Sequence, residues 1–263
     1  MLSKANACII YTFMVIYQSC GGSPLGGRNS MSKLVNNYLT YDENKLYTRL
    51  LAQFEVLGMN ESIKALNLAR KYHDGVVRKS TNQPYIVHPL LMASIAMAIG
   101  DLYDDTLIAV IILHDVVEDN ENVRIEDLPV NSDIRRGVKK MTITKHAGET
   151  KSQSKVRYFN ELLEDKNAVI CKGLDRFVNL STMAGNFAPN KIKKNVIETD
   201  QLLLPILREA KEKYPELTSF LYIIRMMVRS VNETLANVYD VELNGEQLYG
   251  GNDHYNNPYE TEQ

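Results

Sequence analysis

Four ionisable residues lie at the end of one of the most apolar segments of the sequence. Residues 107 to 120 read LIAVIILHDVVEDN, so seven apolar residues are followed by His114 and Asp115 and then by Glu118 and Asp119. Burying such groups costs free energy unless a charge or a metal ion compensates them. An imidazole beside a carboxylate is also half of the ligand set that many divalent metal ions prefer. The segment therefore predicts a metal site.

We expect the helix formed by the apolar run to continue through this motif. Residues four apart share a helix face, so His114 then lies over Glu118. Asp115 lies over Asp119 in the same way. Successive residues differ by about 100° around a helix axis, yet His114 and Asp115 can both reach one point beside the helix.

The remaining ligands would have to come from other parts of the chain, and two residues are candidates. His88 stands in PYIVHPL, and Asp175 stands in the apolar segment ICKGLDRFVNL. Each has a simpler interpretation as well. A histidine beside a proline can cap or pack a helix, and Asp175 could form a surface ion pair with Arg176.

The segments that must position these side chains read almost entirely as helix after Met31. Apolar residues recur three or four positions apart, the pattern of one buried helix face, in 46–57, 63–69 and 217–235. Pro89 suits a first helical turn, and Asp104 or Asp105 can cap the helix that carries the motif. Pro205 should kink or break the helical pattern that starts at Asn190.

The other segments complete an all-α, single-domain pattern without repeats or βαβ units. Residues 121–133 read as loop, and DIRRGVKKM reads as a short helix. The polar stretch TITKHAGETKSQSK is expected to be mobile, with helices following over about 156–163 and 168–183.

The composition is that of a soluble globular protein, with 263 residues, 44% hydrophobic and 24% charged. A net charge of −2 gives no reason to expect binding to nucleic acid or to an anionic membrane. The cysteines, Cys8, Cys20 and Cys171, form neither a disulfide framework nor a zinc spacing, which favours a reducing, cytoplasmic location.

The two ends of the chain differ from the rest. Residues 1–30 contain a short apolar run and small residues like a weak signal peptide, but the run is too short for stable membrane insertion. We expect 1–30 to be a leader or a mis-assigned start outside the fold, and 31–240 to be one domain. Residues 241–263 have little to bury and are expected to be a disordered tail.

The segment from His73 to Met183 resembles the hydrolase domain of the RelA/SpoT family, whose members are HD-type metal hydrolases of the alarmone (p)ppGpp. Three motifs carry the resemblance, in the family's order. The first is matched by His73, Gly75, Arg78, Lys79, Ser80, Pro84, Tyr85, Ile86, His88 and Pro89. The second, Leu-His-Asp-x-x-Glu-Asp, is intact from Leu113 to Asp119. The third is matched by Lys172, Asp175, Arg176, Asn179 and Thr182.

The resemblance implies an HD-domain helical bundle with a defined set of site residues. The implied metal ligands are His88, His114, Asp115 and Asp175. Two imidazoles and two carboxylates suit Mn²⁺ without excluding other divalent metals. Glu118 and Asp119 would order the attacking water or carry its proton. The implied substrate contacts are Arg78, Lys79, Ser80, Asn179 and Thr182.

The sequence also departs from the family pattern. Val76 replaces a glutamine of the first motif, Val178 replaces a histidine of the third, and the turn before Pro84 has one extra residue. By the resemblance, the turn lies near where the family holds the guanine base. The basic runs RRGVKKM and KHAGETKSQSKVR could contact phosphates or simply be solvated.

The resemblance implies release of the 3′-pyrophosphate of (p)ppGpp as the activity. Only about eighty residues follow Met183, which leaves no room for a synthetase and resembles the stand-alone small alarmone hydrolases. Two alternatives remain: hydrolysis of another nucleotide, and a non-catalytic nucleotide sensor. The latter is disfavoured because all four implied ligands and the Glu-Asp pair are present. The oligomeric state is not predicted.

Overall fold

The computed structural model describes residues 41–78, 82–99, 103–144 and 146–243, and within these ranges it is almost entirely helical. The α-helices are α3 (Glu43–Leu57), α4 (Asn60–Tyr72), α5 (Val87–Ile99), α6 (Asp105–Leu113), α7 (Ser132–Met141), α8 (Lys151–Leu162), α9 (Lys166–Ser181), α10 (Pro189–Glu198), α11 (Leu204–Lys213) and α12 (Thr218–Tyr239). Three short helical segments, η1 (Ile125–Asp127), η2 (Thr199–Leu203) and η3 (Pro215–Leu217), join them. The expected all-α fold is confirmed.

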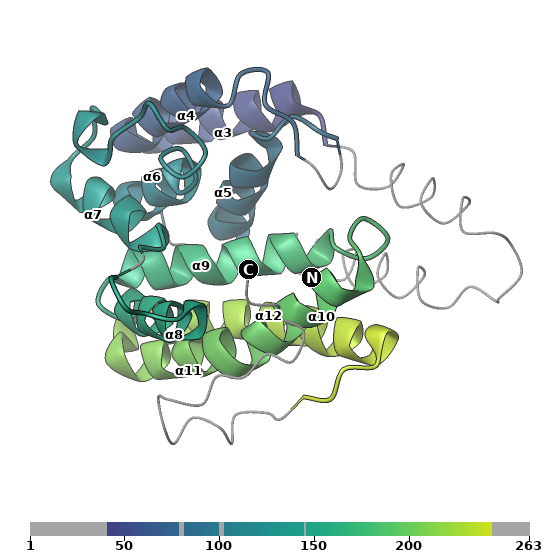
Figure 1. Cartoon of the computed structure of the whole chain (residues 1–263). Coiled ribbons are helices and arrows are strands. Elements are labelled where there is room, and N and C mark those ends of the chain that lie inside the picture. The colour runs from purple at the N-terminus through teal and green to yellow at the C-terminus, as the bar shows by residue number, and fades with distance from the viewer. Residues whose placement is uncertain (1–40, 79–81, 100–102, 145, 244–263) are drawn as a thin grey trace, which may run out of the picture.

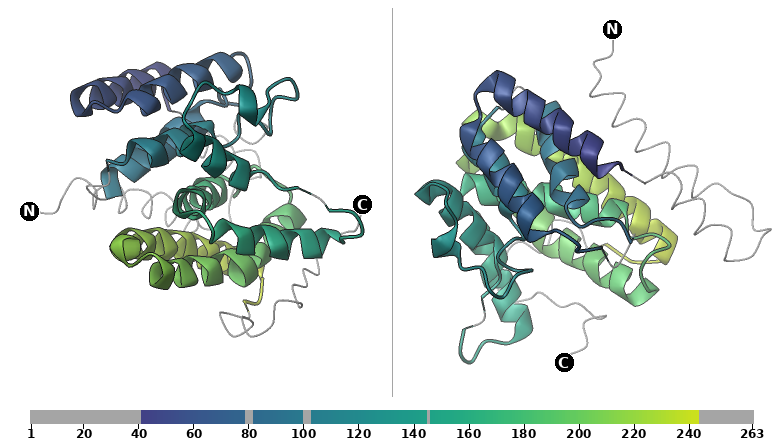
Figure 2. Two further views of the ribbon diagram at one scale, coloured as in Figure 1. Left: turned by 90° about the vertical axis from the view of Figure 1, so that its left-hand side faces the viewer. Right: turned by 90° about the horizontal axis from the view of Figure 1, so that it is seen from above.

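Helix α9 separates two groups of helices. Helices α3 to α7 lie on one side of it and α8, α10, α11 and α12 on the other, as Figures 1 and 2 show. Most of α9 is buried, and it packs against α5, α6, α7, α11 and α12. Gly173 allows the close approach to α12, because a Cβ atom there would lie 2.6 Å from a methyl group of Ile224. A residue of α9 can therefore face either group.

Helix α6 is buried along its whole apolar run, from Leu107 to Leu113. Removing so many aliphatic side chains from water is a main stabilising contribution to the fold. The two candidate capping residues, Asp104 and Asp105, bind different backbone groups. The Asp104 carboxylate accepts from the backbone N–H of Leu107, and Asp105 accepts from the N–H groups of Glu61 and Ser62 at the start of α4. Asp105 thereby ties α4 to α6.

The expectation that α6 continues through the motif is wrong. The helix ends at Leu113, and the residues from His114 to Glu118 form turns. One helical hydrogen bond persists, from the N–H of Asp119 to the carbonyl of Asp115. Because the chain leaves the helix at the motif, the side chains are not held at strict helical offsets.

Two other sequence expectations meet the structure with different results. The second half of the polar stretch is not mobile chain but the first turn of α8, where Thr150 and Gln153 form a reciprocal capping box. Pro205 does interrupt its helical pattern: the π-helical segment η2 separates α10 from α11 just before it. A proline has no N–H to continue the α-helical hydrogen bonds, which explains the change to π-helical hydrogen bonding before it.

Residues 1–30 and nearly all of 241–263 lie outside the described residues, so the expectations for them remain predictions. Among the helices of the described part, none has the length and hydrophobicity needed to cross a membrane.

Candidate metal centre

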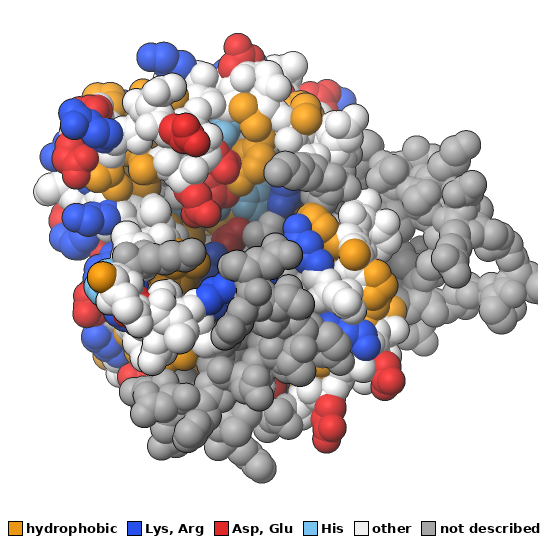
Figure 3. All heavy atoms as spheres, viewed as in Figure 1, with side chains coloured by type: hydrophobic (Ala, Val, Ile, Leu, Met, Phe, Trp, Pro, Cys, Tyr) orange, Lys and Arg blue, Asp and Glu red, His pale blue; other side chains and the backbone are white. Residues whose placement is uncertain are grey.

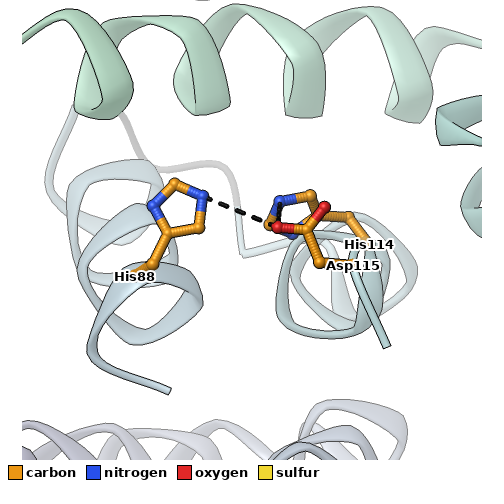
Figure 4. Close-up of side chains that lie close together, drawn as sticks. All are labelled: His88, His114 and Asp115. Atoms are coloured by element: carbon orange, nitrogen blue, oxygen red, sulfur yellow. Dashed lines mark ion pairs between the residues drawn. The ribbon is translucent and has the colours of Figure 1, made fainter. Parts of the chain in front are cut away.

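Three elements bring the predicted ligands together. His88 lies in the first turn of α5, His114 and Asp115 follow the last residue of α6, and Asp175 lies in α9. His88 faces the His114–Asp115 pair in Figure 4. In the space-filling view, histidine side chains are seen at the bottom of a hollow, with acidic and basic side chains around it (Figure 3).

The ligand atoms are close enough to share one ion. One ligand atom each from His88, His114 and Asp115 lie within 4.8 Å of one another. The Nε2 atom of His88 lies 3.1 Å from Oδ1 of Asp175, and Nε2 of His114 lies 3.9 Å from the same oxygen. Two ligands about 2.0–2.2 Å from one ion can be up to about 4.4 Å apart, and both distances to the Asp175 oxygen lie within this limit. The residues present therefore fit a divalent metal ion.

The hydrogen bonding of His114 also suits a ligand. Its Nδ1 atom lies 2.8 Å from the carbonyl oxygen of Ile111, so this nitrogen carries the proton. Nε2 then faces the site and is 2.9 Å from Asp115 Oδ2. Burial lowers the pKa of His114, but the charges of Asp115 and Asp175 outweigh burial and raise it to about 9. A field that favours a proton here would equally favour a divalent cation.

Asp175 is buried, and both of its carboxylate oxygens are held. Nζ of Lys172 lies 2.9 Å from Oδ2, and the Nδ2 amide of Asn179 donates to Oδ1 at 2.5 Å. Burial raises the pKa of Asp175, but the Lys172 charge and the His88 hydrogen bond hold it well below its usual range. The carboxylate therefore stays charged and fixed in orientation.

Three further residues of the site were not given a role from sequence. Lys172 is one of them. The hydroxyl of Tyr85 donates to Asp115 Oδ2 at 2.5 Å, and the ring of buried His73 lies 4.8 Å from that of Tyr85. Burial lowers the pKa of His73 to about 4, so this imidazole is neutral. All three belong to the matched motifs, which was the only signal in the sequence.

The two predicted acid–base residues lie at the exposed edge of the site. Glu118 and Asp119 are both exposed. Partial desolvation, then the negative charge of Asp115, raises the pKa of Glu118, while Lys172 opposes the shift. A carboxylate with a raised pKa is a stronger base than an ordinary glutamate, which suits it to accepting a proton.

The predicted substrate residues have different environments. Arg78 Nη2 donates to Asn179 Oδ1 at 2.6 Å, so these two contact each other across the site. Thr182 is buried, and its hydroxyl bonds the carbonyls of Val178 and Asn179 in its own helix. Lys79 and Ser80 lie outside the described residues.

The basic runs are largely occupied by partners in the fold. Arg136 pairs with Asp133 and Asp165, and Lys140 pairs with Glu164. In the second run, Lys155 pairs with Glu198, while Arg157 pairs with Glu149 and Glu161. These contacts favour a structural role over phosphate binding. Arg176 is likewise not a surface partner of Asp175, because it is buried and pairs with Glu198.

Comparison with known proteins agrees with this geometry. Residues 65–206, more than half of the chain, match the family described as HD domain. The chain belongs to the HD domain family. The matched range contains every residue of the metal centre and begins within α4.

Individual relatives point to one branch of this family. The chain is 31% identical over 148 residues to guanosine-3′,5′-bis(diphosphate) 3′-pyrophosphohydrolase from Haemophilus influenzae, covering 53% of this chain and 21% of that protein. It is 29% identical over 183 residues to the bifunctional (p)ppGpp synthase/hydrolase SpoT from Escherichia coli, covering 67% and 23%. The chain thus spans about a fifth of the length of these relatives. The resemblance to the RelA/SpoT hydrolase domain is confirmed.

Proposed function

We propose that the chain is a metal-dependent phosphohydrolase that removes the 3′-pyrophosphate of (p)ppGpp in the cytoplasm. The products are GDP or GTP and pyrophosphate. The observation that carries the proposal is that ligand atoms of His88, His114 and Asp115 lie within 4.8 Å of one another, with an oxygen of Asp175 3.1 Å from Nε2 of His88. The names of the relatives support the choice of substrate.

His88, His114, Asp115 and Asp175 would hold the metal ion, and we propose Mn²⁺ because this ligand set suits it. When bound, the ion would draw electron density from phosphoryl and water oxygens. The hydroxyl of Tyr85 and the ammonium of Lys172 hold the two carboxylates of this set in place. Neither carboxylate then has to reorganise during the reaction.

Glu118 is the proposed proton acceptor. Water adds to the phosphorus bonded to the 3′ oxygen and loses a proton, and the bond between that phosphorus and the 3′ oxygen breaks. The 3′ oxygen takes up a proton and pyrophosphate leaves. The raised pKa of Glu118 allows it to accept the first proton and return one. Asp119, beside it, would help to order the water.

Arg78 is the proposed contact for the nucleotide. A guanidinium can stack on a purine and also pair with phosphate, and Arg78 is partly exposed at the site. Lys79, Ser80, Asn179 and Thr182 complete the proposed substrate set. Asn179 already bonds Arg78, and Thr182 points its hydroxyl into its own helix.

A nucleotide screen tests the proposal. The full chain with Mn²⁺ is incubated with ppGpp, pppGpp, GTP, ATP and deoxynucleotides, and the products are identified. We expect GDP and pyrophosphate from ppGpp, and no turnover by Asp115→Ala. Asp127→Ala is the matched control, because Asp127 pairs only with exposed Arg124 in the contacts that involve it. Cleavage of another nucleotide with ppGpp untouched would overturn the substrate, and full activity of Asp115→Ala would overturn the metal centre.

A further inference from the structure

A chain of two hydrogen bonds links the proposed substrate contact to a proposed metal ligand. Arg78 Nη2 donates to Asn179 Oδ1 at 2.6 Å, and Asn179 Nδ2 donates to Asp175 Oδ1 at 2.5 Å. The same Asp175 oxygen lies 3.1 Å from Nε2 of His88. One amide therefore lies between a guanidinium and the oxygen that faces the metal centre.

The orientation of this amide is set by its neighbours. Arginine has only donors and an ionised carboxylate has only acceptors. The Asn179 carbonyl must therefore face Arg78, and its NH₂ group must face Asp175. Turning the amide over would place donor against donor and acceptor against acceptor, so the contact on one side fixes the contact on the other.

The two ends of this chain come from distant parts of the sequence. Arg78 lies in the turn between α4 and α5, where its N–H also bonds the carbonyl of Gln83 and Val77 pairs with Pro84. Asn179 lies one helical turn after Asp175 in α9. The Arg78–Asn179 bond thus joins the turn that carries the proposed nucleotide contact to the helix that carries the metal ligand.

We propose that Asn179 is a positioning residue that couples metal binding to nucleotide binding. Arg78 holds the amide, and the amide holds Asp175 Oδ1 in the direction of the ion. Coupling is reciprocal, so the metal ion orders Arg78 for the nucleotide to the same extent. This inference rests on the proposed function, and it assigns Asn179 to the metal ligand and to Arg78 rather than to the nucleoside alone.

Electrostatics alone predicts the opposite effect for Arg78. The guanidinium lies close enough to Asp115 and Asp175 to interact with their charges. Removing a positive charge beside a cation site should strengthen cation binding. Weaker cation binding after removal of Arg78 would therefore report positioning through Asn179, not charge.

Titration of the metal-free full chain with Mn²⁺, without nucleotide, tests the coupling. We expect Asn179→Ala to weaken Mn²⁺ binding by roughly tenfold, the effect of losing a residue that orients a ligand. Arg78→Ala should weaken it to a smaller extent, and the double variant should bind like Asn179→Ala. Unchanged or tighter binding by Arg78→Ala, or additive effects in the double variant, would overturn the inference.

Controls separate this outcome from misfolding and from failure of the proposed function. Ser181→Ala, on the same helix, removes a hydroxyl that donates to the backbone carbonyl of Phe177, and should not change Mn²⁺ affinity. Arg70→Ala removes a guanidinium that bonds Asn44, outside the site. Normal Mn²⁺ binding by Asp115→Ala would show that the proposed metal centre is wrong. If Asp115→Ala loses Mn²⁺ binding but Arg78→Ala binds Mn²⁺ as tightly as the unmodified chain, only the coupling is wrong.

Discussion

Asp175 and Arg176 are consecutive residues of α9 that are both charged and buried, yet they face different surroundings. Arg176 turns towards α10, where Nη2 pairs with Glu198 and Nη1 lies within hydrogen-bonding distance of Asn195 and Thr199. Lys155 of α8 pairs with the other oxygen of Glu198. Asp175 turns towards α5 and α6 and meets the histidines of the metal centre.

The networks around Asp175 and around Arg176 differ in how completely their buried polar atoms are paired. In the network around Asp175, buried nitrogens without a hydrogen-bond partner include both ring nitrogens of His73 and Nδ1 of His88. Among the described residues, no atom of the Arg176, Glu198 and Lys155 side chains is of this kind. A fully paired buried network stabilises a fold, whereas unpaired polar atoms in a native structure call for an explanation such as a ligand. The comparison teaches that burial of charge alone does not mark a site.

The largest expected effect is on the turnover rate, after a change beside the candidate metal centre. Glu118→Gln keeps the shape of the side chain and removes its charge, so kcat should fall by about 10²–10⁴. Steady-state kinetics with Mn²⁺ measures this effect. The metal content of the purified variant should stay normal, and loss of metal together with activity would move Glu118 into the ligand shell.

In the network around Arg176, the expected effect is on the stability of the fold. Glu198→Ala removes the acidic partner of buried Arg176 and one acidic partner of Lys155, which should lower the free energy of unfolding by about 3–5 kcal/mol. Denaturant unfolding measures it, and turnover per folded molecule should stay close to that of the unmodified chain. A large fall in turnover as well would show that the two sides of α9 are not independent.

A smaller effect is expected on the way stability depends on pH. Burial raises the pKa of Glu198, but the charges of Arg176 and Lys155 outweigh burial and lower it to about 2 from 4.5. An acid whose pKa is lowered on folding contributes stability above its unfolded pKa and loses it as the pH falls. The contribution is therefore present above about pH 4.5 and disappears towards pH 2.

Glu198→Gln cannot titrate, so its stability should fall less steeply than that of the unmodified chain through this window. Unfolding free energies measured at several pH values between 5 and 2 test this. An equally steep fall in both proteins would assign the acid sensitivity to other carboxylates. Glu233→Gln is a suitable control, because Glu233 is half-exposed and pairs with exposed Arg229.

The candidate metal centre could be proposed from sequence because its residues stand beside apolar runs. His114 and Asp115 follow the buried apolar run of α6, and Asp175 lies inside the mostly buried α9, so both the polar types and their apolar context were visible. The apolar periodicity likewise predicted α12, and the proline predicted the interruption of the α-helical pattern before Pro205. Both features depend on local sequence.

What could not be predicted depends on contacts between distant segments. Lys172 has the spacing of an ordinary helical ion pair, and only the fold shows that its partner lies in the metal centre. The Arg78–Asn179 bond joins residues 101 positions apart. The polar stretch was expected to be mobile because the sequence does not show what holds it. In the fold, Glu149 of this stretch pairs with Arg157 of α8. The end of α6 at Leu113 was also not predicted, because it depends on the turn that follows the helix.

That early end of α6 has an electrical consequence. The aligned peptide groups of a helix give its carboxyl end a partial negative charge and its amino end a partial positive charge. The carboxyl end of α6 lies at His114, while the amino end of α5 lies at His88. The centre therefore receives the negative pole of one helix and the positive pole of another. The backbone itself therefore favours a cation near the end of α6 and an anionic group near the start of α5.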